Sequence, residues 1–208
     1  MTKIPHSKID ADMHYLQLLA QSFPTIADAS TEIINLEAIM ALPKGTEHFL
    51  ADLHGESEAF RHVLKNASGN IKRKVNELFG NDIREVEKKE LCTLIYYPEQ
   101  KLELIKAQEK DIEDWYRITI HQLVKICRDV SSKYTRSKVR KSLPQDFAYI
   151  IEELLHESLS DNDKAAYVSV IVNTIISTGR ADDFICAICN VIQRLAIDQL
   201  RPDRKSVV

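Results

Sequence analysis

The chain has 208 residues, of which 44% are hydrophobic, and its formal net charge is −3. This length allows one sizeable core, and the small negative charge gives no field that would draw the chain to nucleic acid or to an anionic membrane. Five glycines and six prolines are few for this length, which favours long helices over many turns.

No segment of the sequence indicates secretion or membrane insertion. The N-terminal residues 1–6 lack the apolar stretch of a signal peptide, and no run reaches the roughly 18 apolar residues that a membrane span needs. The cysteines lie inside apolar-periodic segments, so we expect reduced thiols rather than disulfides. They are Cys92, Cys127, Cys186 and Cys189. A cytoplasmic protein is the resulting prediction.

The first fifty residues predict two helices and one strand. Residues 10–23 show helical apolar spacing, and Ser30 or Thr31 can cap a second helix. After the breaker at residues 43–45, the apolar run 48–51 favours a buried strand, although a buried helical turn has the same pattern. One strand cannot satisfy its own backbone groups, so either a second strand is hidden in the sequence or its partners lie outside the chain.

Beyond Gly55 the helical period continues almost without interruption, and roughly two-thirds of the chain is expected to be helical, against the usual third. The fold class predicted is therefore mainly α, with one short strand. Helices are predicted around residues 60–64, 71–79 and 91–95, along the stripe 102–130 in one or two pieces, and over residues 147–159, 165–176 and 182–200.

A basic connector joins the long stripe to the helices that follow. It contains no acidic residue between Asp129 and Asp146. Such a run can hold phosphate or an anionic effector through charge-assisted hydrogen bonds, or it can be a solvated connector or a subunit contact. Its cations are Lys133, Arg136, Lys138, Arg140 and Lys141.

The candidate chemistry lies in Asp52-Leu53-His54-Gly55, directly after the predicted strand. In an extended backbone Asp52 and His54 point to the same side, so a carboxylate and an imidazole can converge on one ion such as Mn, Fe or Zn. Gly55 lets the backbone turn away, and a following helix would aim its N-terminal N–H groups at an oxyanion. The alternative is that Asp52 is a helix N-cap and His54 a surface residue.

Two further patterns have simpler interpretations. Cys186 and Cys189 have the spacing of a redox or zinc pair, but they lie in an apolar helical stripe without a second pair, so core packing is favoured. His48 points to the same side as Asp52 in a regular strand and is a candidate to support the metal ligands, although packing explains it equally simply.

Residues 43–56, Pro-Lys-Gly-Thr-Glu-His-Phe-Leu-Ala-Asp-Leu-His-Gly-Glu, resemble the first signature of calcineurin-like metallophosphoesterases. More narrowly, they are similar to the class 3 fructose-1,6-bisphosphatases of Firmicutes and related bacteria. The resemblance extends from residue 12 to residue 200 and includes residues 31–39, 96–99, 131–138, 147–150, 152–155 and 193–195.

The resemblance implies hydrolysis of the 1-phosphate of fructose 1,6-bisphosphate in gluconeogenesis, with manganese as the usual metal. It also implies a two-sheet αββα sandwich with a dinuclear site, in which Asp52 and His54 are ligands of one metal. Two metals would clamp the phosphate and lower the pKa of a bridging water. No catalytic residue, sugar-binding residue or other cofactor can be assigned, and homo-oligomerisation stays open.

The resemblance also implies a division of the chain. Residues 1–56 would be N-terminal helices plus the first sandwich strand, residues 57–200 a helical insertion, and residues 201–208 an atypical tail. The later metal and phosphate motifs of the family have no counterpart, so we expect a truncated chain that is inactive by itself. The alternative function is a non-catalytic helical interaction or regulatory module.

Overall fold

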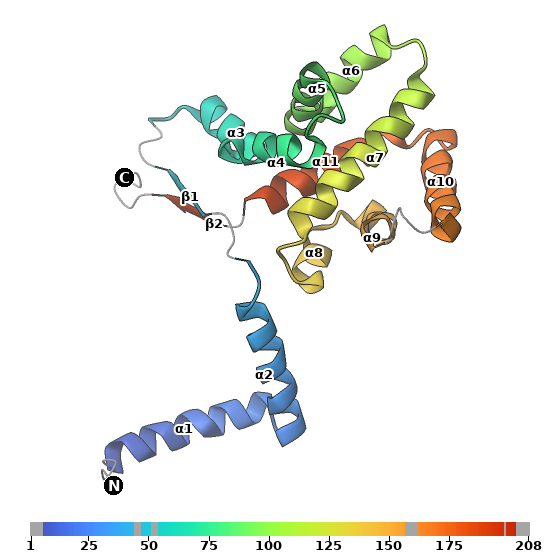
Figure 1. Ribbon diagram of the computed structural model, residues 1–208. Coiled ribbons are helices and arrows are strands. Elements are labelled where there is room, and N and C mark those ends of the chain that lie inside the picture. The colour runs from blue at the N-terminus through green and yellow to red at the C-terminus, as the bar shows by residue number, and fades with distance from the viewer. Residues whose placement is uncertain (1–5, 44–46, 51–53, 157–161, 198, 203–208) are drawn as a thin grey trace. The chain divides into compact units, whose positions relative to one another are not determined.

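The computed structural model describes residues 6–43, 47–50, 54–156, 162–197 and 199–202 (Figure 1). The predicted mainly helical class is confirmed, and no helix in this described part is long and apolar enough to cross a membrane. The elements are α1 (His6–Ser22), α2 (Ile26–Met40), β1 (Glu47–Leu50), α3 (Ser57–Asn66), η1 (Ala67–Gly69), α4 (Asn70–Phe79), α5 (Glu85–Tyr96), α6 (Pro98–Gln108), α7 (Ile112–Ser131), α8 (Arg136–Ser142), η2 (Gln145–Phe147), α9 (Ala148–His156), α10 (Asn162–Ser177), α11 (Ala181–Ala196) and β2 (Gln199–Pro202).

The chain forms two compact units, Met1–Pro43 and Lys44–Val208. The first contains α1 and α2. The prediction that Ser30 or Thr31 caps the second helix is wrong, because Thr25 does so: the Asp28 amide donates to Thr25 Oγ1 at 3.1 Å, and the Thr25 amide donates to Asp28 Oδ2 at 3.2 Å. This reciprocal capping box starts the helix one turn earlier.

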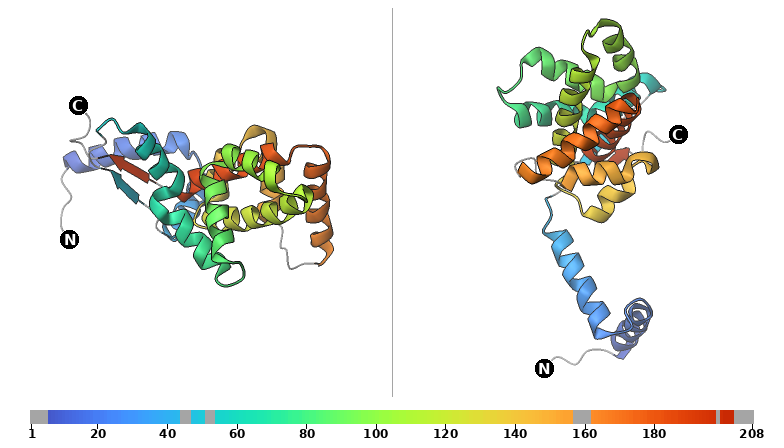
Figure 2. Two further views of the ribbon diagram at one scale, coloured as in Figure 1. Left: turned by 90° about the horizontal axis from the view of Figure 1, so that it is seen from above. Right: turned by 90° about the vertical axis from the view of Figure 1, so that its right-hand side faces the viewer.

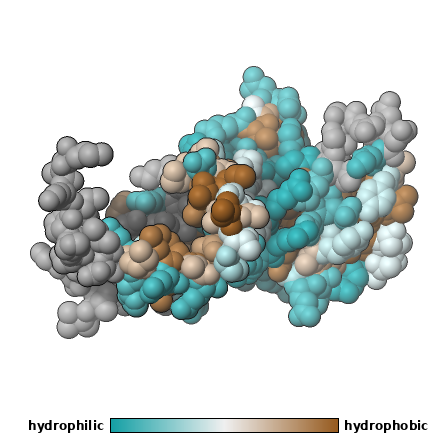
Figure 3. Space-filling view, turned by 90° about the horizontal axis from the view of Figure 1, so that it is seen from below, coloured by the Kyte–Doolittle hydropathy of each residue, from teal (hydrophilic) through white to brown (hydrophobic). Residues whose placement is uncertain are grey.

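Large apolar side chains of the first unit stay exposed. No residue of α2 is buried, and Ile26 and Met40 are at least 80% exposed. In the view from below, brown, hydrophobic atoms lie open on the surface of these helices (Figure 3). Two helices alone have no interior that could cover such faces on all sides. The exposed set includes Met13, Tyr15, Leu16, Leu18, Ile26, Ile33, Ile34, Leu36, Ile39 and Met40.

The second unit is built around α11, which packs against α7, α5 and α6 (Figure 2). Its apolar residues recur three and four positions apart, and most of its circumference is buried. Phe184 meets Phe147 edge to face, with 5.4 Å between the ring centroids. The fully buried residues at the centre of this core include Ile71, Val75, Ile95, Ile120, Leu123, Ile126, Cys127, Ile151, Phe184, Ile185, Ile188, Cys189 and Ile192.

Most predicted helices of the second unit are present. The long stripe is two helices, since α6 ends at Gln108 and Asp111 caps α7 by accepting from the Asp114 amide at 3.1 Å. The basic connector is not an irregular linker but contains the seven-residue helix α8. Thr135 caps α8 by accepting from the Lys138 amide. The sequence did not predict this helix, because the cationic side chains of α8 show no apolar period.

The cysteines are free thiols in the described part, as expected. Cys92, Cys127 and Cys189 are buried, and Cys186 is partly buried. Burial raises the pKa of Cys127 to about 12 and that of Cys189 well above its ordinary value. The predicted core packing is confirmed, because Cys189 belongs to the hydrophobic core and Cys186 packs against it.

The single predicted strand has a partner within the chain. β1 pairs in parallel with β2, and the register places Glu47 opposite Gln199 and Phe49 opposite Arg201. The prediction of a helix reaching Leu200 is therefore wrong. α11 ends at Ala196, and Pro202 disfavours helical backbone at the residue before it. The αββα sandwich, and the division at residue 56 between sandwich and insertion, stay predictions.

Core packing can be tested with two isoleucines on the same helix. Ile120 is 0% exposed and Ile118 is 53% exposed, both on α7. Ile120→Ala is expected to lower the free energy of unfolding by about 2–5 kcal/mol, because it opens a cavity in the centre of the core. Ile118→Ala, the matched control, should cost well under half of that. Urea unfolding followed by circular dichroism measures both, and equal losses would contradict the described core.

Candidate metal half-site and the contacts that position it

The candidate metal motif follows β1 and precedes α3, so the predicted order of strand, turn and helix is confirmed on the described residues. His54 is exposed and has φ 45°, and Gly55 has φ 75°. Glycine adopts this left-handed backbone freely, but for histidine it costs of order 1 kcal/mol or more. Asp52 lies outside the described residues.

The argument that Asp52 and His54 share one side of an extended strand does not hold at His54. Extended backbone in the described part ends at Leu50, and His54 is left-handed. Strand alternation therefore does not direct the side chain of His54. The assignment of Asp52 and His54 as ligands stays a prediction.

The alternative interpretation, in which Asp52 is a helix N-cap and His54 a surface residue, holds only for His54. Glu56, not Asp52, occupies the N-cap position of α3, and its side chain makes no capping hydrogen bond. His54 is a surface residue, as that alternative requires and as a metal ligand also permits. Within the described residues no three His, Cys, Asp or Glu side chains are arranged to hold a metal. By its sequence the motif offers one carboxylate and one imidazole, a partial set of ligands.

His48 of β1 is anchored by the helical unit. Its side chain is only 8% exposed, and its Nδ1 lies 2.9 Å from Ser68 Oγ in η1. Nε2 is buried and has no hydrogen-bond partner in the described structure. Burial, and then the positive charge of Lys133, lower the pKa of His48. Packing explains these contacts, and a supporting role toward the metal ligands stays a prediction.

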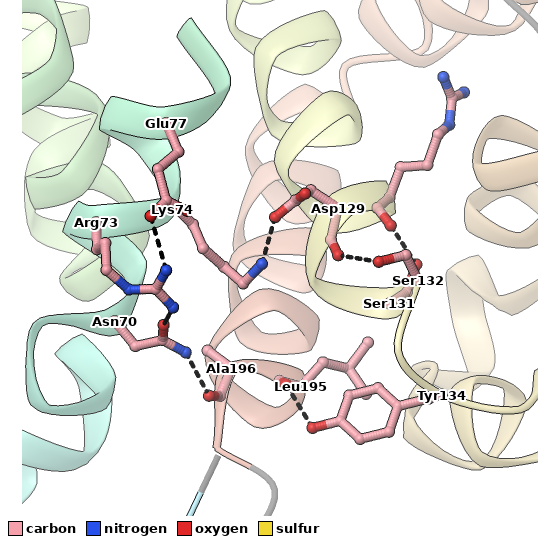
Figure 4. A network of polar contacts seen from close by, with 11 residues as sticks. Asn70, Arg73, Lys74, Glu77, Asp129, Ser131, Ser132, Tyr134, Leu195 and Ala196 are labelled. Carbon is pink, nitrogen blue, oxygen red and sulfur yellow. Dashed lines mark hydrogen bonds and ion pairs between the residues drawn. The ribbon is translucent and has the colours of Figure 1, made fainter. Parts of the chain in front are cut away.

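The C-terminus of α11 is held by side chains from two other segments (Figure 4). Asn70 Nδ2 donates to the Ala196 carbonyl at 3.0 Å in a buried contact, and the Tyr134 hydroxyl donates to the Leu195 carbonyl at 2.8 Å. The last carbonyls of a helix have no partner inside the helix. These two bonds satisfy such carbonyls at the point where the chain leaves for β2.

A second set of contacts orients Asn70 and joins α4 to α7 (Figure 4). Arg73 donates to Asn70 Oδ1 at 2.7 Å and also pairs with Glu77 at 2.7 Å. Lys74 pairs with Asp129 of α7 at 2.5 Å, and the lysine side chain is only 17% exposed. Asn70 is thereby oriented, with its oxygen toward Arg73 and its nitrogen toward α11.

Asn70, Tyr134 and Ser68 were not identified from the sequence as residues that position the motif. A buried asparagine and a surface one look alike in a sequence, because the partner carbonyl of Asn70 is 126 positions away. The only local signal is Ser68-Gly69, which indicates a break between helices. Ser68 has φ 51° at that break.

The hydrogen bond from Asn70 to the end of α11 predicts a specific loss of stability on mutation. Asn70→Ala leaves the buried Ala196 carbonyl without its donor, so the free energy of unfolding should fall by about 1–3 kcal/mol. The control is Asn173→Ala, since Asn173 is exposed and accepts from Arg117 on the surface. Hydrogen exchange at the amides of β1 and β2 should also accelerate in Asn70→Ala, and unchanged exchange there would contradict the positioning role.

His48 predicts a pH dependence of stability. Because its pKa is lower in the folded chain than the ordinary 6.5, the unfolded chain takes up the proton first as the pH falls. The stability that neutral His48 provides is complete above pH 6.5 and is lost as the pH falls through the folded-state pKa. Urea unfolding of the wild type and His48→Gln should show a shallower acid loss in the variant; parallel curves would contradict the assignment.

Comparison with known proteins places this chain beside fructose-1,6-bisphosphatases. Residues 14–201 match the family model described as Firmicute fructose-1,6-bisphosphatase. The curated relatives include proteins named fructose-1,6-bisphosphatase class 3 from Parabacteroides distasonis, 72% identical over 201 residues, and Bacteroides thetaiotaomicron, 71% identical over 199 residues. A protein of the same class from Clostridium beijerinckii is 65% identical over 189 residues.

The matches cover nearly all of this chain but a minor part of each relative. The alignments include 96% of the chain for the first two proteins and 91% for the third. They include 30%, 30% and 29% of the relatives, so the chain spans about 30% of their length. No solved structure matches the chain. Since the family model covers most of its residues, the chain belongs to the Firmicute fructose-1,6-bisphosphatase family.

Proposed function

We propose that this chain is part of a cytoplasmic fructose-1,6-bisphosphatase, a phosphoric monoester hydrolase that releases the 1-phosphate of fructose 1,6-bisphosphate in gluconeogenesis. The family match over residues 14–201 carries the proposal. The position of Asp52-Leu53-His54-Gly55 between β1 and α3 supports it, because strand–turn–helix is the context that such a motif requires. The resemblance to metallophosphoesterases would make the complete fold an αββα sandwich.

Manganese is the proposed metal, and Asp52 and His54 are its proposed ligands in this chain. Carboxylate oxygen and imidazole nitrogen suit Mn, and His54 lies at the surface of the described structure. When bound, a pair of such metals would polarise the phosphate and activate water. His54 would orient one metal against the strand end, and the amides at the start of α3 would favour the negatively charged phosphate.

Two protein ligands hold a divalent ion weakly, since a structural or catalytic site normally uses three or four. We therefore expect this chain by itself to release little phosphate from fructose 1,6-bisphosphate in the presence of Mn. Rapid, Asp52-dependent release by the purified chain would contradict this expectation.

The role of the motif can be tested in a chimera. Residues 14–201 would replace the matching segment of the Bacteroides thetaiotaomicron relative, and phosphate release would be measured with Mn and fructose 1,6-bisphosphate. Asp52→Asn or His54→Asn should lower the rate by at least about a hundredfold, since even the outer partners of metal ligands change activity 10–100-fold. His14→Asn, on the exposed face of α1, is the matched control and should leave the rate unchanged.

The chimera has two outcomes that contradict the proposal. One is a chimera that folds but releases no phosphate while the intact relative does. The other is an active chimera in which Asp52→Asn and His54→Asn have no more effect than His14→Asn. A circular dichroism spectrum and a melting curve of each variant separate loss of the fold from loss of the metal.

A second candidate function is a helical interaction or regulatory module, which the exposed apolar faces of α1 and α2 favour. Metal titration distinguishes the two functions. Mn binding that disappears in Asp52→Asn supports the phosphatase. Stable oligomers without Asp52-dependent Mn binding support the module.

A further inference from the structure

A small cavity lies where the end of α7, the helix α8 and the end of α9 meet, and Figure 1 shows these three segments side by side. Its volume is about 220 Å³. That is below the roughly 300–1,000 Å³ of pockets that hold drug-sized ligands, so an ion or one short, small molecule fits it. Neither Asp52 nor His54 is among the residues that line it.

Three arginines and one glutamate are among the described residues that line the cavity. Arg128 comes from α7, and Arg136 and Arg140 come from α8. Glu152 is the acidic residue of the described lining; it pairs with Arg140 at 2.7 Å and lies 4.0 Å from His156 Nε2.

Arg128 is held in place by the backbone of α9. Its Nε donates to the Leu155 carbonyl at 3.1 Å, and its Nη2 donates to the Leu154 carbonyl at 2.6 Å. Burial lowers the pKa of Arg128, yet a guanidinium in a protein stays charged. The structure thus fixes one cationic group at the wall of the cavity.

Arg136 is the cation with unused hydrogen-bonding capacity. In the described part of the chain it makes no hydrogen bond and no ion pair, although it lines the cavity. A guanidinium offers five N–H donors in a planar fork that matches the oxygens of a phosphate group. The neighbouring Lys138 adds positive charge, with its amine 4.2 Å from the centroid of the Tyr134 ring.

We propose that this cavity binds a phosphate group, either as free phosphate or as the phosphate end of a small metabolite. Arg136 would be its bidentate donor, and Arg128 and Arg140 would form the neighbouring wall of the site. A polyanion such as RNA fits less well, because the cavity is small and the chain carries a net charge of −3. The proposal does not depend on the phosphatase function.

The test is titration of the metal-free chain with inorganic phosphate at constant ionic strength, with EDTA present, followed by calorimetry. Wild type should bind one phosphate per chain. Arg136→Gln should raise the dissociation constant by about tenfold, the loss of affinity expected for one charge-assisted contact. Lys141→Gln is the matched control: it removes one cation from the same helix at a position that does not line the cavity. It should change the constant by less than about twofold.

Two results would overturn the proposal. One is the absence of saturable binding up to about 10 mM phosphate, which is too weak for a built site. The other is an equal effect of Arg136→Gln and Lys141→Gln, which indicates diffuse attraction. Glycerol 3-phosphate in a parallel titration identifies the source of the ligand. Tighter binding of glycerol 3-phosphate supports a metabolite, and tighter binding of inorganic phosphate supports the free ion.

The location is tested by proton NMR of the imidazole groups. The chain has seven histidines, and His156 alone among them lines the cavity in the described structure. Its resonance, assigned with His156→Asn, should shift with the same dissociation constant as the calorimetric binding. A static His156 resonance together with a shifting His54 resonance would place the phosphate elsewhere and overturn the proposal.

Discussion

The structure depends on how α11 ends. This helix lies at the centre of the second unit, and almost every element of the helical body touches it. Asn70 and Tyr134 donate hydrogen bonds to the carbonyls of Ala196 and Leu195. The helix therefore ends there rather than continuing toward Leu200. Because β2 begins three residues later, these contacts set the position of β2, and with it the register of β1.

The same contacts connect the helical body to the candidate metal motif. β1 is held on one side by β2 and through His48 by Ser68, which precedes Asn70 by two positions. The break at residues 67–69 therefore supports both the strand that leads into Asp52-Leu53-His54-Gly55 and the asparagine that ends α11. Parallel strands usually lie inside larger sheets covered by helices, and a two-stranded pair is marginal alone. The anchoring by the helical body stabilises this pair.

Much of the helical body follows from periodicity in the sequence. Residues such as Ile188 and Leu123 recur at helical spacing, and burial of an apolar stripe is a local property that a sequence records. Three features did not follow: the early start of α2, the helix α8 and the strand β2. The start of α2 depends on a capping box, and α8 has a cationic rather than an apolar pattern. The strand β2 depends on hydrogen bonds from Asn70 and Tyr134, which are distant in the sequence. A partner strand within the chain was one of two alternatives for β1, and it could not be located because residues 47–50 and 199–202 are far apart in the sequence.

The candidate site was predictable in its residue types and its context but not in its geometry. The order of strand, turn and helix is present, while the left-handed backbone of His54 replaces the extended one from which convergence with Asp52 was argued. The cavity between α7, α8 and α9 could not be predicted from residue types and their order. The cations of α8 form a run in the sequence, but Arg128 and His156 join them only through folding.

The central claim is that Asp52 and His54 are the metal-binding residues of this chain, and paramagnetic line broadening by Mn tests it most directly. Substoichiometric Mn, added to the isotope-labelled chain, broadens the amide resonances of residues near the bound ion even when binding is weak. The account predicts broadening centred on the amides of residues 50–57, which disappears in Asp52→Asn. Broadening spread over the acidic surface, and unchanged in that variant, would contradict it.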